Sequence, residues 1–127
     1  MSAATSPKIL PVVFVVDDEK IIALTLTMIL IAAGFRAIAF LDPLEVLQAA
    51  QALTPDLMIS DVVMPHMSGI DLAIQFRALC PNSKVLLISG QTQTSDLLDK
   101  AKEDGYDFNI IGKPIHPTDL LAALNRL

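Results

Sequence analysis

The sequence predicts one α/β domain with a doubly wound, five-stranded parallel sheet and helices on both faces. Two observations predict it. Short apolar segments alternate five times with longer segments of helical pattern, and the links between them are short and rich in turn residues. The length of 127 residues suits one domain with one core. Right-handed crossovers between successive parallel strands favour the strand order 2-1-3-4-5.

In the first half of the chain, strands are expected where aliphatic and β-branched residues run without charge. The first and third such segments are apolar on both faces, which is typical of central strands covered by helices on both sides. Gly34 ends the first helix, and Asp42 with Pro43 begins the second as N-cap and first-turn residue. The expected elements are strand 12–16, helix 20–33, strand 36–40, helix 43–53 and strand 57–60.

The second half repeats the pattern. Ser68 and Gly69 begin the third helix, and Pro81 marks the turn that follows it. Gly105 ends a more polar fourth helix, and Pro117 begins the last one. The expected elements are helix 69–80, strand 84–88, helix 94–104, strand 108–111 and helix 117–127.

Residues 1–10 are expected to form a flexible tail before a domain of residues 11–127, with neither a secretory signal nor membrane insertion. The uncharged segment 21–35 is shorter than the ~20 residues that span a bilayer. The chain has nine Lys and Arg residues, which are scattered, and fourteen acidic residues. Direct nucleic-acid binding is therefore not expected. The single cysteine, Cys80, is expected in the core, and a cytoplasmic setting fits.

Polar side chains follow four of the five expected strands. Asp17 and Asp18 follow the first strand, and Asp61 follows the third. Ser89 and Lys113 follow the fourth and fifth. The carboxyl ends of parallel strands lie at one edge of the sheet, and ligands bind there, at the switch point between the first and third strands. We therefore expect all five side chains to converge.

The converging groups suit phosphoryl chemistry. Three carboxylates in one pocket repel one another unless a cation is present, and hard oxygen ligands suit Mg²⁺ or Mn²⁺. Lys113 and the Ser89 hydroxyl can bind phosphoryl oxygens. Asp61 can then act as a nucleophile that forms an aspartyl phosphate.

Taken together, these motifs resemble the receiver domain of two-component response regulators over residues 11–127. The resemblance implies a flavodoxin-like fold and a phosphorylation-controlled switch that is not a turnover enzyme. The expected donor is a phosphohistidine on a sensor histidine kinase or a histidine phosphotransfer protein. The motifs that carry the resemblance are Asp17-Asp18, residues 61–69, Ser89-Gly90 and Lys113-Pro114.

The resemblance also implies a role for each site residue. Asp61 would be the phosphoacceptor, and Asp18, Asp61 and the backbone carbonyl of Val63 would ligate Mg²⁺ directly. Asp17 would act through water. Lys113 would bind the phosphoryl group. The peptide bond between Lys113 and Pro114 would typically be cis. Ser89 would swing toward the phosphoryl group and couple the site to the fourth helix and fifth strand.

Several positions depart from the family pattern. Ile110 stands three residues before Lys113, where the family usually has Tyr or Phe, and the segment 105–113 is one residue longer. Phe108 would share the face of Ile110. The output change is therefore hypothesised to be a shift of the fourth helix. Val63 and Gln91 would flank the phosphoryl group, and because Val63 cannot orient water, slow self-dephosphorylation is expected.

Other interpretations stay open at this point. The uncharged first helix is either mostly core, a docking face for the phosphodonor, or a homodimer contact. His66 and His116 are expected to be surface loop residues. The chain is either a stand-alone receiver or a piece of a longer regulator or hybrid kinase. An aspartate-nucleophile phosphatase requires a second acidic residue at the position of Val63. A nucleotide or flavin binder requires a glycine-rich loop at the position of residues 17–19.

Overall fold

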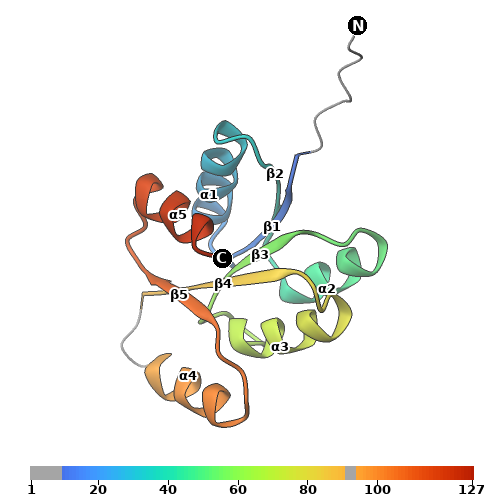
Figure 1. The fold of residues 1–127 in the computed structure, drawn as a ribbon, viewed down its shortest axis with the longest axis vertical. Coiled ribbons are helices and arrows are strands. Elements are labelled where there is room, and N and C mark those ends of the chain that lie inside the picture. Colours follow the sequence, from blue (N-terminus) through green and yellow to red (C-terminus); the bar gives the residue numbers. More distant parts are fainter. Residues whose placement is uncertain (1–9, 91–93) are drawn as a thin grey trace, which may run out of the picture.

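The structure, a computed structural model, describes residues 10–90 and 94–127. Its sheet has five parallel strands in the order β2-β1-β3-β4-β5, so the predicted flavodoxin-like topology is confirmed (Figure 1). Most expected boundaries are met within one or two residues. The strands are β1 Val12–Val16, β2 Arg36–Phe40, β3 Leu57–Asp61, β4 Lys84–Ser89 and β5 Asn109–Gly112.

Helices cover both faces of the sheet (Figure 1). Helices α1 and α5 pack over one face in an apolar cluster that includes Leu30 and Leu120. Helices α2, α3 and α4 contribute to a second cluster on the other face, around Phe14 and Phe76. The helices are α1 Lys20–Ala32, α2 Pro43–Ala52, α3 Gly69–Leu79, α4 Thr94–Glu103 and α5 Pro117–Asn125.

The expected boundary residues act as predicted. The Asp42 side chain accepts a hydrogen bond from the Leu44 N–H at 2.9 Å, which caps α2. The Ser68 hydroxyl accepts one from the Asp71 N–H at 3.1 Å and caps α3. Gly34 lies in the left-handed region with φ +97°, which lets the chain leave α1 and enter β2.

The central strands fix the position of the site because they are buried on both faces. All five residues of β3 are buried, including Ser60 and Asp61. Cys80 is 2% exposed and belongs to the interior, as expected. Residues 1–9 of the expected tail and the flanking residue Gln91 lie outside the described residues. Within residues 10–90 and 94–127, none of the helices combines the length and apolar character needed to cross a membrane.

The segment before β5 differs from expectation. The strand begins at Asn109, one residue later than predicted, and Phe108 is buried. The Arg77 guanidinium carbon lies 4.6 Å from the centroid of the Phe108 ring. The Tyr106 ring stacks on the Phe108 ring, with 6.1 Å between the two centroids. Ile110, by contrast, is 39% exposed. The aromatic rings are therefore held between α3 and the end of α4, away from the position before Lys113.

Candidate functional site

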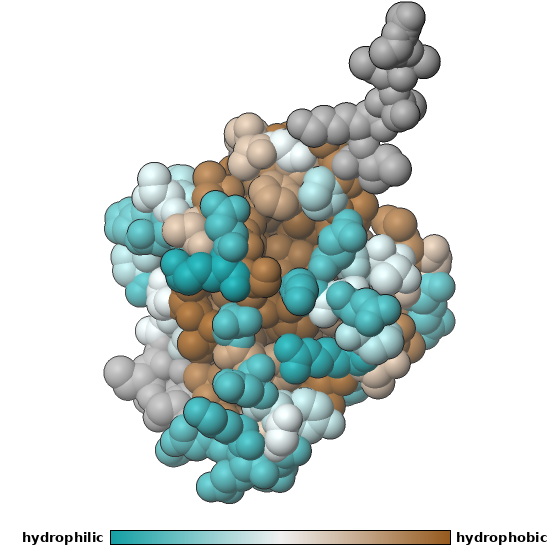
Figure 2. Space-filling model, in the orientation of Figure 1, coloured by the Kyte–Doolittle hydropathy of each residue, from teal (hydrophilic) through white to brown (hydrophobic). Residues whose placement is uncertain are grey.

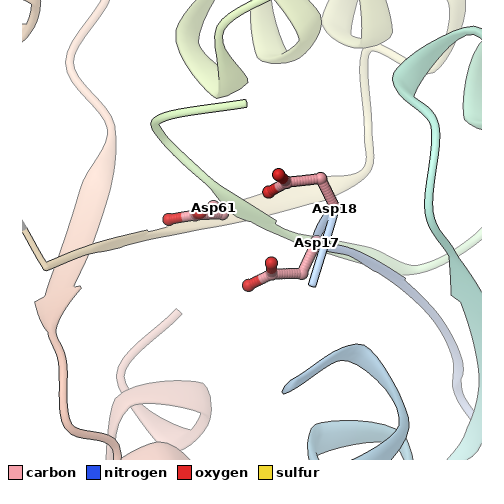
Figure 3. A group of neighbouring side chains, drawn as sticks. All are labelled: Asp17, Asp18 and Asp61. Atoms are coloured by element: carbon pink, nitrogen blue, oxygen red, sulfur yellow. The ribbon is translucent and has the colours of Figure 1, made fainter. Parts of the chain in front are cut away.

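Two neighbouring strands deliver three carboxylates to one point of the sheet edge. Strands β1 and β3 are paired so that Val16 lies beside Ser60, which places the residues after them together. One carboxylate oxygen from each of Asp17, Asp18 and Asp61 lies within 4.8 Å of the others. Figure 3 shows the three side chains pointing to the same side of the strands. The predicted convergence of these residues is confirmed.

Lys113, which directly follows β5, joins the cluster. Its Nζ lies 3.4 Å from an oxygen of Asp17 and 3.4 Å from an oxygen of Asp61. The Lys113-Pro114 peptide bond is cis, as the resemblance implied. Gly90 leaves room for the lysine stem, because a Cβ at that position would lie 3.2 Å from the Lys113 Cδ. The ammonium group is therefore held directly at the carboxylates.

Burial and charge shift the protonation of this cluster. Burial, and then the neighbouring Asp17, raise the pKa of Asp61, and Lys113 offsets only part of that rise. Burial alone would lower the pKa of Lys113, but the carboxylates of Asp17 and Asp61 together raise it. The lysine is therefore charged at neutral pH. A second cation would relieve the repulsion that remains between the carboxylates.

The donor set fits a divalent cation with hard oxygen ligands. One oxygen of Asp17 contacts Lys113, and the other accepts the Glu19 N–H at 2.9 Å. Asp18 is exposed, and its carboxylate has no protein hydrogen bond or ion pair in the described part of the chain. The arrangement thus leaves Asp18 more available for direct coordination than Asp17.

A cavity of about 750 Å³ opens from this cluster toward α1. Asp61 and Lys113 line it, together with Val63, which is 48% exposed. The apolar flank of α1 and the residues after Lys113 form its walls, lined by Ile21, Ile22, Thr25, Leu26, Ile29, Pro114 and Ile115. Apolar side chains therefore share this cavity with Asp61 and Lys113.

Ser89 lies beside the cluster at the end of β4. It pairs with Gly112 across the sheet, and its carbonyl accepts the Lys113 N–H at 2.9 Å. Its side chain is half-buried. The backbone of β4 therefore helps to hold the lysine in place.

The β3–α3 loop contains two constraints that sequence reasoning missed. Gly69 packs so closely on Asp61 that a Cβ there would overlap the Asp61 carbonyl and lie 3.0 Å from the Ser60 Oγ. His66 has φ +72° and is the central residue of a strained three-residue turn. The Met67 N–H closes this turn by donating a hydrogen bond to the Pro65 carbonyl at 2.8 Å. The sequence pattern indicated Gly69 only as the first residue of a helix.

The two histidines are exposed, as expected. Neither His66 nor His116 belongs to a group of three or more possible metal ligands in the described residues, where the aspartate cluster is the group found.

Comparisons with known proteins point in one direction. A family model described as "Response regulator receiver domain" matches residues 13–125. The chemotaxis protein CheY of Thermotoga maritima is 29% identical over 116 residues, covering 91% of this chain and 95% of CheY. The transcriptional regulatory protein CreB of Escherichia coli is 36% identical over 115 residues, covering 91% of this chain and 49% of CreB. This chain thus spans about half the length of CreB.

A solved structure agrees with these relatives. The chemotaxis protein CheY4 of Vibrio cholerae superposes with a TM-score of 0.82 and 28% sequence identity. The match covers 93% of this chain and 98% of CheY4.

Proposed function

The chain belongs to the response regulator receiver domain family of two-component systems, and on that premise we propose that Asp61 is its phosphoacceptor. The donor would be a phosphohistidine on a sensor histidine kinase or histidine phosphotransfer protein. The observation that carries this proposal is the buried contact of Asp61 with Lys113 inside a cluster of three carboxylates. The receiver domain we propose spans residues 11–127.

In the proposed transfer, an Asp61 carboxylate oxygen attacks phosphorus. A bond from that oxygen to phosphorus forms as the bond from phosphorus to the donor imidazole breaks, and the imidazole leaves with the electron pair. Lys113, already 3.4 Å from Asp61, would move its contact onto a phosphoryl oxygen. Burial keeps bulk water from competing with these contacts. This single-turnover chemistry, with slow loss of phosphate, is why we propose no turnover activity.

Mg²⁺, or Mn²⁺, is the cation we propose for this site. Asp18, Asp61 and the backbone carbonyl of Val63 would ligate it, with Asp17 acting through water while it keeps its contact with Lys113. The bound cation supplies charge neutralisation for the carboxylates and the incoming phosphoryl group. The free carboxylate of Asp18 supports this division of roles.

The phosphodonor would dock on the walls of the cavity. Ile22 and Ile29 of α1 line this cavity with Ile115, and Asp61 lines it as well. A helix of the donor protein can lay an apolar face there while its phosphohistidine reaches Asp61. This surface is continuous with the reacting carboxylate, which supports a donor protein as its partner.

The phosphatase alternative has no support at the site. That class needs an acidic residue two positions after the nucleophile, and this chain has Val63 there.

Incubation with a small phosphodonor such as phosphoramidate tests the proposed function. We expect the intact mass to increase by one phosphoryl group in Mg²⁺ and not in excess chelator. Asp61→Ala should take up nothing, while Asp107→Ala, a change of an exposed aspartate, should behave as wild type. Uptake that survives the Asp61 substitution would exclude Asp61 as the acceptor.

Val63→Asn is expected to speed the loss of phosphate from the phosphorylated chain about tenfold, because an amide at this position can orient an attacking water. Val63 lines the cavity and is 48% exposed, so the change should cost little stability. The decay of phosphorylated protein, followed after donor removal, measures the effect. Val63→Ala is the control for lost size, and equal decay of both variants would contradict the water-orienting role.

Phosphorylation is expected to move α4 rather than an aromatic side chain at position 110. Ile110 is exposed, and the rings of Tyr106 and Phe108 are packed against each other and Arg77. Amide chemical shifts recorded with and without the phosphoryl mimic beryllofluoride, in Mg²⁺, should change along Thr94–Glu103. Ile110→Ala should leave those changes intact. Unchanged α4 amides would contradict the hypothesis.

A further inference from the structure

Ser60, the residue before the proposed phosphoacceptor, carries a hydroxyl that takes no part in the transfer itself. The Ser60 side chain is fully buried. Hydrophobic residues occupy the middle of Figure 2, where the strands lie in Figure 1, and a hydroxyl among such residues requires a hydrogen-bond partner. The Ser60 hydroxyl donates to the backbone carbonyl of Asp61 at 2.9 Å. A buried side chain therefore binds the backbone of the residue that would accept the phosphoryl group.

The side chains of Ser60 and Asp61 lie on opposite faces of β3. Side chains alternate along a strand, so Ser60 shares the face of Met58, which belongs to the apolar cluster on the side of α3. Asp61 shares the face of Ile59, which belongs to the cluster on the side of α1 and α5. The Ser60 hydroxyl therefore points away from the Asp61 carboxylate and acts on it through the backbone.

Three hydrogen bonds hold the backbone at the end of β3. The Val62 N–H donates to the Ile88 carbonyl of β4 at 3.0 Å, and the Gly69 N–H at the start of α3 donates to the Val62 carbonyl at 2.8 Å. The third bond is the one from Ser60 to the Asp61 carbonyl, which belongs to the same peptide group as the Val62 N–H. Of the three, only this bond comes from a side chain, so a substitution can remove it and leave the backbone groups in place.

Helix α3 packs directly over the bond between Ser60 and Asp61. A Cβ at Gly69 would lie 3.0 Å from the Ser60 Oγ and would overlap the Asp61 carbonyl. The hydrogen bond is therefore enclosed by protein, and bulk water does not compete for the Asp61 carbonyl.

We propose that Ser60 is a positioning residue, which fixes the peptide group between Asp61 and Val62 and thereby sets the distance between two ligands of the cation. The inference rests on the proposed function, in which the Asp61 carboxylate and the Val63 carbonyl ligate Mg²⁺. The peptide group held by Ser60 lies between these two ligands along the chain. Its rotation would move one ligand relative to the other, and Mg²⁺ tolerates little departure from its preferred geometry.

Ser60→Ala removes the hydroxyl and should fold, because alanine fits the space of serine. We expect the Mg²⁺ dissociation constant of the unphosphorylated chain, measured by calorimetric titration, to rise about 5–10-fold. Phosphorylation by phosphoramidate in saturating Mg²⁺ should slow about tenfold, because the carboxylate is less well placed. Ser60→Thr keeps the hydroxyl and should lie closer to the wild type than Ser60→Ala in both measurements.

Ser83→Ala is the matched control. Ser83 is also buried, and its hydroxyl donates to the Pro55 carbonyl. These two residues precede β4 and β3, at the end of the sheet opposite Asp61. The melting temperature should fall by a few degrees in both alanine variants, since each loses one buried hydrogen bond. Mg²⁺ affinity and phosphorylation rate should change less than about twofold in Ser83→Ala.

Amide hydrogen exchange in the metal-free chain tests the role of Ser60 without phosphorylation. In Ser60→Ala, exchange of the Val62 amide should accelerate about tenfold more than exchange of the Leu86 amide, which lies within β4 and reports the general loss of stability. A wild type that takes up no phosphoryl group would contradict the proposed function, whereas the exchange result would still decide whether Ser60 holds this peptide group.

Three results would overturn the proposal. The first is a Ser60→Ala chain that binds Mg²⁺ as tightly as the wild type does. The second is an equal loss of Mg²⁺ affinity in Ser60→Ala and Ser83→Ala, which would assign the effect to stability. The third is equal acceleration of exchange at Val62 and Leu86 in Ser60→Ala.

Discussion

Asp61→Asn is expected to abolish phosphorylation and to raise the free energy of unfolding of the metal-free chain by about 1–2 kcal/mol. The amide has no nucleophilic carboxylate, so uptake from any donor should be lost. The stability rises because a buried charge beside Asp17 is removed, while Lys113 keeps its contact with Asp17. Urea unfolding in chelator measures the gain, with Asp107→Asn, an exposed change, as the control.

The stability gained by Asp61→Asn should increase as the pH rises. The pKa of Asp61 is raised in the folded chain, so folding favours its protonated form and ionisation lowers the stability of the wild type. Below the ordinary aspartate pKa of about 4, both proteins carry a neutral group there and the gain should vanish. It should be fully present above the raised pKa. A gain that is largest in acid would contradict this explanation.

Gly69→Ala is expected to lower the free energy of unfolding by about 1–3 kcal/mol, although alanine has a higher intrinsic helix propensity than glycine. The cause is space: the new Cβ would overlap the Asp61 carbonyl, so β3 or α3 has to move. The Gly69 N–H also donates to the Val62 carbonyl at 2.8 Å, which ties the two segments together. Displacing Asp61 should also slow phosphorylation up to about 100-fold.

Gly112→Ala is the control for this prediction. Its Cβ would meet only the Ser89 carbonyl oxygen, at 3.8 Å, which is an ordinary contact. The stability should change by no more than about 0.5 kcal/mol. Equal losses in the two variants would show that the position of Gly69 against Asp61 is not the cause.

The sequence predicted the sheet and the edge at which its polar side chains gather, because both follow from local signals. Apolar segments of strand length, capping residues such as Asp42 and the polar residues after each strand all act within a few positions of where they stand. Asp17, Asp61 and Lys113 converge because parallel strands end at one edge, so their meeting needed only the topology. This is why the convergence of these side chains could be predicted from the sequence.

Other features depend on contacts between distant segments and were missed or left open. Gly69 is required by the carbonyl eight residues before it, and no pattern within α3 reveals that contact. Phe108 leaves β5 because it packs with Arg77 from α3. The first helix could be core or surface by composition alone, and only its packing leaves Ile21 and Met28 exposed.

The ring pair at the end of α4 has a spectroscopic consequence. The chain has no tryptophan and one tyrosine, Tyr106, which stacks on Phe108. Intrinsic tyrosine emission of the unlabelled protein therefore comes from a single place, the junction of α4 and β5. Emission intensity and anisotropy give a direct optical record of that junction during phosphorylation, without a dye or an engineered fluorophore.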